Sequence, residues 1–176
     1  MGKNKRKMEI RNCTTDDLEK IIELYDDARA LQRERKMVVW PVFEPKFILT
    51  EMMQLRQWKI VVNGSIACNW AITYQDPEIW EERDQNNAIY IHRIVTNPSF
   101  RGGRFIDVIV DWAKIYARSL DKQFVRLDTL GNNKKLIAHY TSAGFAYLGM
   151  FRLSNTQSLP EHYQNEPNCC LFELAL

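Results

Sequence analysis

Apolar residues recur along this chain with two different periods, which separate expected strands from expected helices. Short β-branched or alternating runs predict strands at 8–13, 58–62, 65–74, 89–96, 124–129, 145–153 and 169–176. Recurrence every three or four residues predicts helices at about 18–31, 45–55, 105–120 and 133–143. This order predicts a fold of the α/β (α+β) class, in which helices cover both faces of a mixed sheet.

Turn residues mark the boundaries of these elements. Asn63-Gly64 between two apolar runs predicts a two-residue hairpin turn, and Gly144 stands where a helix C-cap belongs. The polar stretch 76–87 is expected to form a loop or a short helix. The polar stretch 154–168 is expected to be a long loop before the last strand.

The stretch 89–104 combines a buried strand with a loop that carries two glycines between two arginines, Arg101-Gly102-Gly103-Arg104. A helical pattern begins directly afterwards, at Phe105. Free N–H groups and the positive end of the helix dipole point in the same direction at such a helix start. The sequence therefore predicts an anion site here, and the arginines suit phosphate oxygens.

Size and composition limit the possible classes of protein. The chain has 176 residues and a mass of 20.8 kDa, which predicts one domain at 8–176 after a basic tail at 1–7. We expect the tail to be solvated and mobile, with a weak anionic contact as the alternative. A net charge of +2 without a basic stripe argues against a nucleic-acid partner.

Neither membrane insertion nor secretion is indicated by the sequence. No apolar stretch approaches the roughly 20 residues of a membrane span, and no apolar core follows the basic N-terminus. The four cysteines, at positions 13, 68, 169 and 170, show no disulfide-framework spacing. We therefore expect free buried thiols and a cytoplasmic location.

The element order and three local motifs resemble the GNAT superfamily of acyl-CoA-dependent N-acyltransferases over about residues 8–175. The first motif is the strand and loop Ile94-Val-Thr-Asn-Pro-Ser-Phe-Arg-Gly102. The second is Asn133 followed seven residues later by Tyr140, and the third is Gly144-Phe145. The resemblance implies a mostly antiparallel central sheet of about seven strands, with a central strand splayed from its neighbour.

The resemblance also implies acetyl-CoA as co-substrate and a set of contacts to it. Its pantetheine arm is expected to pair with the splayed strand like an added strand, and its pyrophosphate to meet loop amides. The residues implied are Ile94, Val95, Thr96, Arg101, Gly102, Gly103, Arg104, Phe105 and Asn133. Tyr140 is implied as the general acid that protonates the leaving thiolate; the alternative for Tyr140 is a half-buried core tyrosine.

The loop departs from the family pattern Q/R-x-x-G-x-G/A at two positions. Aligned on Arg101, it places Arg104 at the first family glycine and Ile106 at the final small residue. Those positions are small so that phosphate approaches the helix start closely. We therefore expect Ile106 to crowd the pyrophosphate or to shift the loop.

The acceptor amine has to lose a proton, so a base is needed. The central strand has no acid and offers His92, whose unperturbed pKa suits this role. A structural histidine is the alternative, and Asp128 on the next strand is a weaker candidate base. His139 is expected on the surface. Because the histidines are far apart and lack zinc-like spacing, no metal is expected.

The leading hypothesis is direct transfer of an acetyl group from acetyl-CoA to a small-molecule amine, without a covalent enzyme intermediate. Two alternatives stay open: a non-catalytic module that binds acyl-CoA or another ligand, and an enzyme that acetylates a protein N-terminus or lysine. Trp40 and Trp80 are candidate walls of the acceptor pocket, with ordinary packing as the alternative. The last strand is expected to be an exposed sheet edge, which could support pairing in a homodimer.

Overall fold

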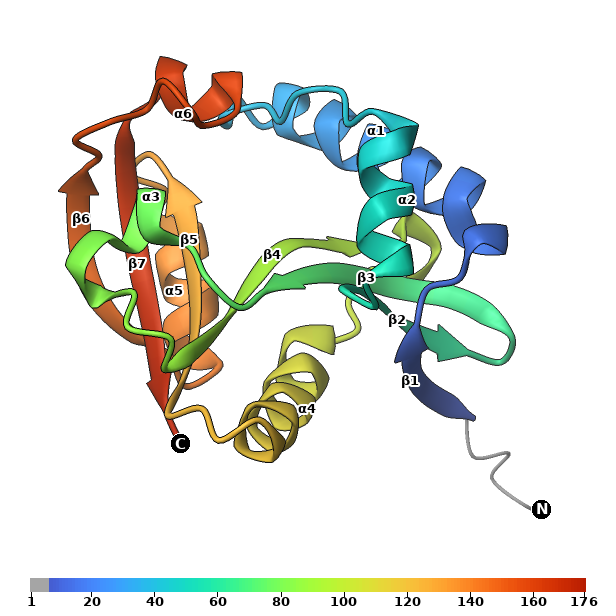
Figure 1. Cartoon of the computed structure of the whole chain (residues 1–176). Coiled ribbons are helices and arrows are strands. Elements are labelled where there is room, and N and C mark those ends of the chain that lie inside the picture. Colours follow the sequence, from blue (N-terminus) through green and yellow to red (C-terminus); the bar gives the residue numbers. More distant parts are fainter. Residues whose placement is uncertain (1–6) are drawn as a thin grey trace. The chain divides into compact units, whose positions relative to one another are not determined.

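The computed structural model describes residues 7–176, so residues 1–6 of the expected basic tail lie outside the described part. The described chain contains a seven-stranded sheet with the order β1-β2-β3-β4-β5-β7-β6 (Figure 1). The strands are β1 (Met8–Asn12), β2 (Gln57–Val62), β3 (Ser65–Thr73), β4 (Ala88–Thr96), β5 (Phe124–Leu130), β6 (Ala146–Arg152) and β7 (Asn168–Ala175). β4 and β5 are parallel, whereas the pairs β1–β2, β2–β3, β5–β7 and β6–β7 are antiparallel. The predicted mixed, mostly antiparallel sheet is confirmed.

Six α-helices accompany these strands in residues 7–176. They are α1 (Leu18–Glu34), α2 (Pro45–Met53), α3 (Pro77–Trp80), α4 (Phe105–Ser119), α5 (Lys134–Ser142) and α6 (Glu161–Asn165). Short 3-10 turns occupy Thr15–Asp17, Glu81–Arg83 and Pro98–Phe100. The described chain divides into two compact units. Unit 1 comprises residues up to 28, 42–72 and 93–103, and unit 2 comprises 29–41, 73–92 and 104–176.

Unit 1 is built on the hairpin of β2 and β3, with β1 antiparallel to β2 (Figure 1). Asn63 and Gly64 connect the two strands with φ values of 50° and 86°. Positive φ at both central residues is the requirement of a type I′ turn, whose twist matches that of the strands. The predicted Asn-Gly hairpin is therefore confirmed.

A buried ion pair lies inside unit 1, at the start of the second half of β4. Arg93 has φ +52°, a left-handed conformation that costs a side-chain-bearing residue about 1 kcal/mol or more. One terminal nitrogen of Arg93 donates to both carboxylate oxygens of Glu51 at 2.6 Å, and the Glu51 side chain is 2% exposed. The guanidinium carbon also lies 5.0 and 5.1 Å from the ring centroids of Phe43 and Phe47. These contacts fix the irregular backbone.

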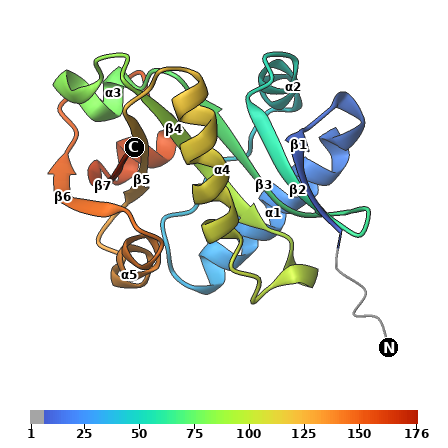
Figure 2. The same cartoon turned by 90° about the horizontal axis from the view of Figure 1, so that it is seen from below.

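Unit 2 is built on β5, β7 and β6, with α4 in contact with β5 and α5 in contact with β6 (Figures 1 and 2). The strand β7 pairs with β5 on one side and with β6 on the other. The expectation that the last strand forms an exposed sheet edge is therefore wrong, because β6 occupies that edge. The expected long loop 154–168 also contains a short helix, α6.

All four cysteines are free and buried, as predicted. None of the helices within residues 7–176 combines the length and the hydrophobicity that a bilayer crossing requires.

Candidate active site

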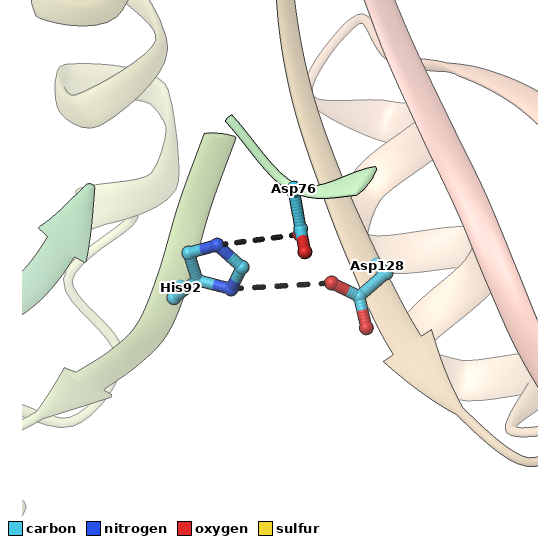
Figure 3. Close-up of side chains that lie close together, drawn as sticks. All are labelled: Asp76, His92 and Asp128. Atoms are coloured by element: carbon cyan, nitrogen blue, oxygen red, sulfur yellow. Dashed lines mark ion pairs between the residues drawn. The ribbon is translucent and has the colours of Figure 1, made fainter. Parts of the chain in front are cut away.

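The end of the pairing between β4 and β5 places a histidine between two carboxylates. β4 pairs with β5 from Ala88↔Phe124 to Ile91↔Leu127. His92 and Asp128 directly follow the last of these pairs on the two strands. Asp76 comes from the turn after β3, where it is the N-cap residue of α3. Figure 3 shows the imidazole of His92 facing the carboxylates of both Asp76 and Asp128.

The two ring nitrogens of His92 face different carboxylates. Nε2 lies 3.5 Å from Oδ2 of Asp76, and Nδ1 lies 4.0 Å from Oδ1 of Asp128 (Figure 3). The hydroxyl of Thr73 lies 3.0 Å from Nε2. A proton on Nδ1 faces the negative charge of Asp128, and in this tautomer Nε2 is the accepting nitrogen, toward which the Thr73 hydroxyl can donate. The arrangement suits a proton acceptor.

The two carboxylates differ in how they are held. Oδ2 of Asp128 accepts hydrogen bonds from the Tyr163 hydroxyl at 3.0 Å and from the Cys169 thiol at 3.3 Å. Asp76 is 8% exposed, and its Oδ2 is buried without a hydrogen-bond partner within the described chain. A buried polar atom that lacks a hydrogen bond destabilises the folded state by about 1–3 kcal/mol. Asp128 is therefore held in place by hydrogen bonds from Tyr163 and Cys169, whereas Oδ2 of Asp76 has no hydrogen-bond donor within the described chain.

Burial changes the proton affinity of both acids. Loss of solvation, followed by the charges of Asp128, Glu78 and Asp84, raises the pKa of Asp76 to about 8. Loss of solvation also raises the pKa of Asp128. Two neighbouring carboxylates of this kind favour a state in which they hold one proton, as in other carboxylate pairs. The site is therefore able to exchange protons near neutral pH.

The same three residues form a group that could hold a metal ion. One ligand atom from each of Asp76, His92 and Asp128 lies within 4.8 Å of the others. The two nitrogens of an imidazole ring point in different directions and cannot both bind one ion. Because Asp76 and Asp128 are nearest to different nitrogens, the geometry suits proton transfer better than chelation by all three groups.

Helix α5 carries the other two residues singled out on the sequence. Tyr140 is half-buried, with its ring centroid 5.4 Å from that of Phe172 and 6.2 Å from that of Phe145. Asn133 is the N-cap of α5, and its side-chain oxygen accepts hydrogen bonds from the Lys135 and Leu136 amides. The structure thus gives Asn133 a capping role. His139 is exposed, as predicted.

The loop before α4 is exposed, and its two departures from the family pattern have distinct environments. Gly102 has φ +87°, and the position that a Cβ would occupy there is open space. Arg104 donates to the carboxylate of Asp107 at 2.6 and 3.0 Å while remaining 64% exposed. Ile106 is 4% exposed, so its side chain packs inward and is not part of the exposed loop surface.

Trp80 does not line a pocket. It is fully buried in a cluster with Ile79, Ala88 and Tyr90, and its ring lies 4.8 Å from the guanidinium carbon of Arg126. The alternative of ordinary packing therefore holds for this tryptophan. Trp40 is half-buried, and its backbone N–H donates to the Gln32 side chain at 2.9 Å.

Comparison with known proteins identifies this arrangement of strands and helices. A structure of a GNAT-family acetyltransferase from Listeria monocytogenes superposes with a TM-score of 0.76, covering 100% of this chain and 99% of that one at 19% identity. The chain has the GNAT fold. A second GNAT-fold neighbour is yncA of Salmonella typhimurium, described as a putative acetyltransferase with its cofactor acetyl-CoA. Its TM-score is 0.66 at 16% identity, with 96% of this chain and 94% of that chain covered.

Sequence comparison adds one relative. The chain is 28% identical over 147 residues to an uncharacterized N-acetyltransferase of Methanocaldococcus jannaschii, MJ1207, and the match covers 77% of this chain. The match spans 59% of the length of that relative. No family model matches the sequence.

Asp76 is the site residue that the sequence analysis missed. It stands in a polar stretch with several other acids, and nothing in its local pattern distinguishes it from a solvated loop residue. Its position becomes informative only when β3 and β4 bring the turn beside His92.

Proposed function

We propose that this protein is an N-acetyltransferase that moves the acetyl group of acetyl-CoA to a primary amine of a small molecule. The observation that carries the proposal is the position of His92, whose Nε2 and Nδ1 face two buried carboxylates on a GNAT scaffold. A GNAT fold alone is compatible with several functions, so the argument rests on this site. The named activity of the Methanocaldococcus relative agrees with it.

The reaction proceeds by direct attack. The amine nitrogen attacks the thioester carbonyl carbon, a C–N bond forms, and the C–S bond breaks. The proton lost by the nitrogen goes to Nε2 of His92, and the leaving thiolate takes a proton from the Tyr140 hydroxyl. The products are the N-acetylated amine and CoA, and His92 returns its proton through solvent while Tyr140 regains one. The charge of Asp128 stabilises the imidazolium formed in this step.

Acetyl-CoA is the proposed co-substrate, and two features of the chain support a site for it. The first N–H groups of α4 have no partner within the helix, which makes the helix start suitable for a pyrophosphate. The exposed loop before it provides Gly102 with positive φ and open space. The proposed contacts are Ile94, Val95, Thr96, Arg101, Gly102, Gly103, Arg104, Phe105 and Asn133. The Salmonella neighbour, which is named with acetyl-CoA, supports the same co-substrate.

The two arginines of the loop are not equivalent in this proposal. Arg104 already shares its charge with Asp107 through two hydrogen bonds, so a phosphate has to compete for it. Arg101 is exposed. We therefore assign the main side-chain contact with the pyrophosphate to Arg101 and an auxiliary one to Arg104.

Calorimetry and a thiol-release assay together test the function. Acetyl-CoA is titrated into the protein, and CoA release is then followed with a panel of small amines and short peptides. Binding with turnover on a small amine supports the proposal. Binding without turnover on the whole panel indicates an acyl-CoA-binding module, and turnover restricted to peptides indicates a protein acetyltransferase. Absence of acetyl-CoA binding refutes the acetyltransferase itself.

Location and assembly remain proposals of the same kind. The four buried free thiols support a reducing compartment, of which the cytoplasm is the usual case. The sheet edges that could pair in a homodimer are β1 and β6, because β7 is paired on both sides. Sedimentation equilibrium distinguishes a dimer from a monomer.

A further inference from the structure

Asp76 has an oxygen that the fold buries and does not satisfy. The residue is 8% exposed, its Oδ2 receives no hydrogen bond within the described chain, and this oxygen lies 3.5 Å from Nε2 of His92. Figure 3 shows the carboxylate facing the ring of His92. Its side chain makes no capping hydrogen bond at the start of α3. A polar group kept in this state costs stability, which is typical of functional sites.

The surroundings of Asp76 favour a cation. The groups that act on or face it are Asp128 on β5, Glu78 in α3, Asp84 after the 3-10 turn, His92 on β4, Tyr163 in α6 and Cys169 on β7. Four of these seven groups, counting Asp76 itself, are acids, and none is a lysine or arginine. Asp128 and Asp84 have hydrogen-bond donors of their own, Tyr163 for the first and Tyr90 for the second. Asp76 is thus the acid in this group whose buried oxygen lacks one.

We propose that Oδ2 of Asp76 binds the acceptor amine in its protonated form, so that the substrate class is primary alkylamines. This inference rests on the proposed function. An alkylammonium brings three N–H donors and a positive charge to this oxygen, which lacks a donor within the described chain. The ammonium nitrogen is then next to Nε2 of His92, which takes the proton that must leave before attack and passes it to solvent. Nε2 then takes the second proton as the C–N bond forms. An arylamine is uncharged at neutral pH and gains little from this oxygen.

The two aspartates have different roles because they face different nitrogens of the His92 ring. Asp76 lies at the Nε2 edge, where the substrate nitrogen meets the base, and Asp128 lies at the Nδ1 edge. Tyr163 and Cys169 hold Asp128 in place. Asp128 therefore positions the base, whereas Asp76 binds the substrate. Replacement of each is expected to affect a different kinetic constant.

The number of protons released when the amine binds tests the proposal without turnover. In the empty site the carboxyl of Asp76 holds a proton at neutral pH, because burial and the neighbouring acids raise its pKa to about 8. An arriving ammonium displaces that proton, so binding releases about one proton per complex at pH 7. At pH 9 the carboxyl is already ionised and the release disappears. A neutral amine bound elsewhere also releases a proton, but it does so equally with or without Asp76.

Calorimetric titration of cyclohexylamine in the presence of CoA, in two buffers of different ionisation enthalpy, measures this proton. Wild-type protein is expected to release about one proton at pH 7, whereas Asp76→Asn is expected to release none and to bind at least about tenfold more weakly. Glu78→Gln is the control, because it removes a nearby exposed charge and keeps the buried oxygen. Equal affinity and equal proton release in wild type and Asp76→Asn overturn the proposal.

Steady-state kinetics with acetyl-CoA separates failure of this inference from failure of the proposed function. Cyclohexylamine and aniline are similar in size, and only the first is charged at neutral pH. The expected result is a preference of at least about tenfold in kcat/KM for cyclohexylamine, which Asp76→Asn removes through KM. Transfer to both amines with equal efficiency refutes the ammonium site and leaves the acetyltransferase standing. Binding that depends on Asp76 without transfer to any amine refutes the acetyltransferase and leaves the ammonium site standing.

Discussion

The buried carboxyl of Asp76 makes folding stability depend on pH in an unusual direction. Burial raises its pKa from the ordinary 3.8 to about 8, so the folded state holds a proton that the unfolded chain has lost between these values. Stability therefore falls as pH rises through this window, because the folded state binds more protons. The difference corresponds to about 1.4 kcal/mol for each pH unit over which the folded state holds the additional proton.

Asp76→Asn tests this reasoning, because asparagine keeps the shape and cannot ionise. Urea unfolding of both proteins is measured from pH 5 to pH 9. We expect the free energy of unfolding of Asp76→Asn to rise relative to that of the wild type between pH 5 and pH 8, by about 1.4 kcal/mol for each pH unit, and the difference to stay constant above pH 8. Asp111→Asn, an exposed acid on α4, is the control and should follow the wild type at every pH. A difference between wild type and Asp76→Asn that is constant with pH, or that moves in favour of the wild type as pH rises, refutes the argument.

Tyr140→Phe is expected to lower kcat by about 10²-fold or more with little change in KM, while Tyr147→Phe on β6 leaves turnover unchanged; equal kcat values contradict the general-acid role. Glu51→Ala leaves a buried guanidinium unpaired and is expected to cost about 3–5 kcal/mol in urea unfolding, against at most about 1 kcal/mol for the exposed Glu23→Ala. Gly102→Ala is expected to lower the free energy of unfolding by about 1 kcal/mol, because the residue has positive φ. It is also expected to weaken CoA binding in calorimetry. An unchanged affinity for CoA argues against this loop as the pyrophosphate site.

Local sequence patterns predicted turns and helices correctly where neighbouring residues determine the backbone conformation. Asn63-Gly64 specifies its turn by backbone conformation, and the apolar periodicity of 105–120 marks the helix that the structure ends at Ser119. The order of the strands in the sheet was harder to predict from the sequence. The insertion of β7 between β5 and β6 depends on pairings between distant segments, so the expectation of a free last strand was wrong.

The candidate site could also be predicted only in part from the sequence. His92 was identifiable because a histidine in an apolar strand is conspicuous. Its two carboxylate neighbours come from other elements, and only folding brings them to opposite ring nitrogens. The pKa of Asp76 also depends on burial in three dimensions, which no local pattern encodes. Tyr140 and the loop residues were assigned through a family resemblance, and their roles stay predictions.

The distribution of the four cysteines allows the opening of each unit to be timed separately. Cys13 and Cys68 belong to unit 1, and Cys169 and Cys170 belong to unit 2. All four are at most 2% exposed, and burial raises the pKa of Cys13 and Cys68 to about 12, so their thiols resist alkylation in the folded state. Mass spectrometry of peptides alkylated over time therefore gives one opening rate from each cysteine pair. Without any introduced label, the native chain reports whether its two halves unfold together or one before the other.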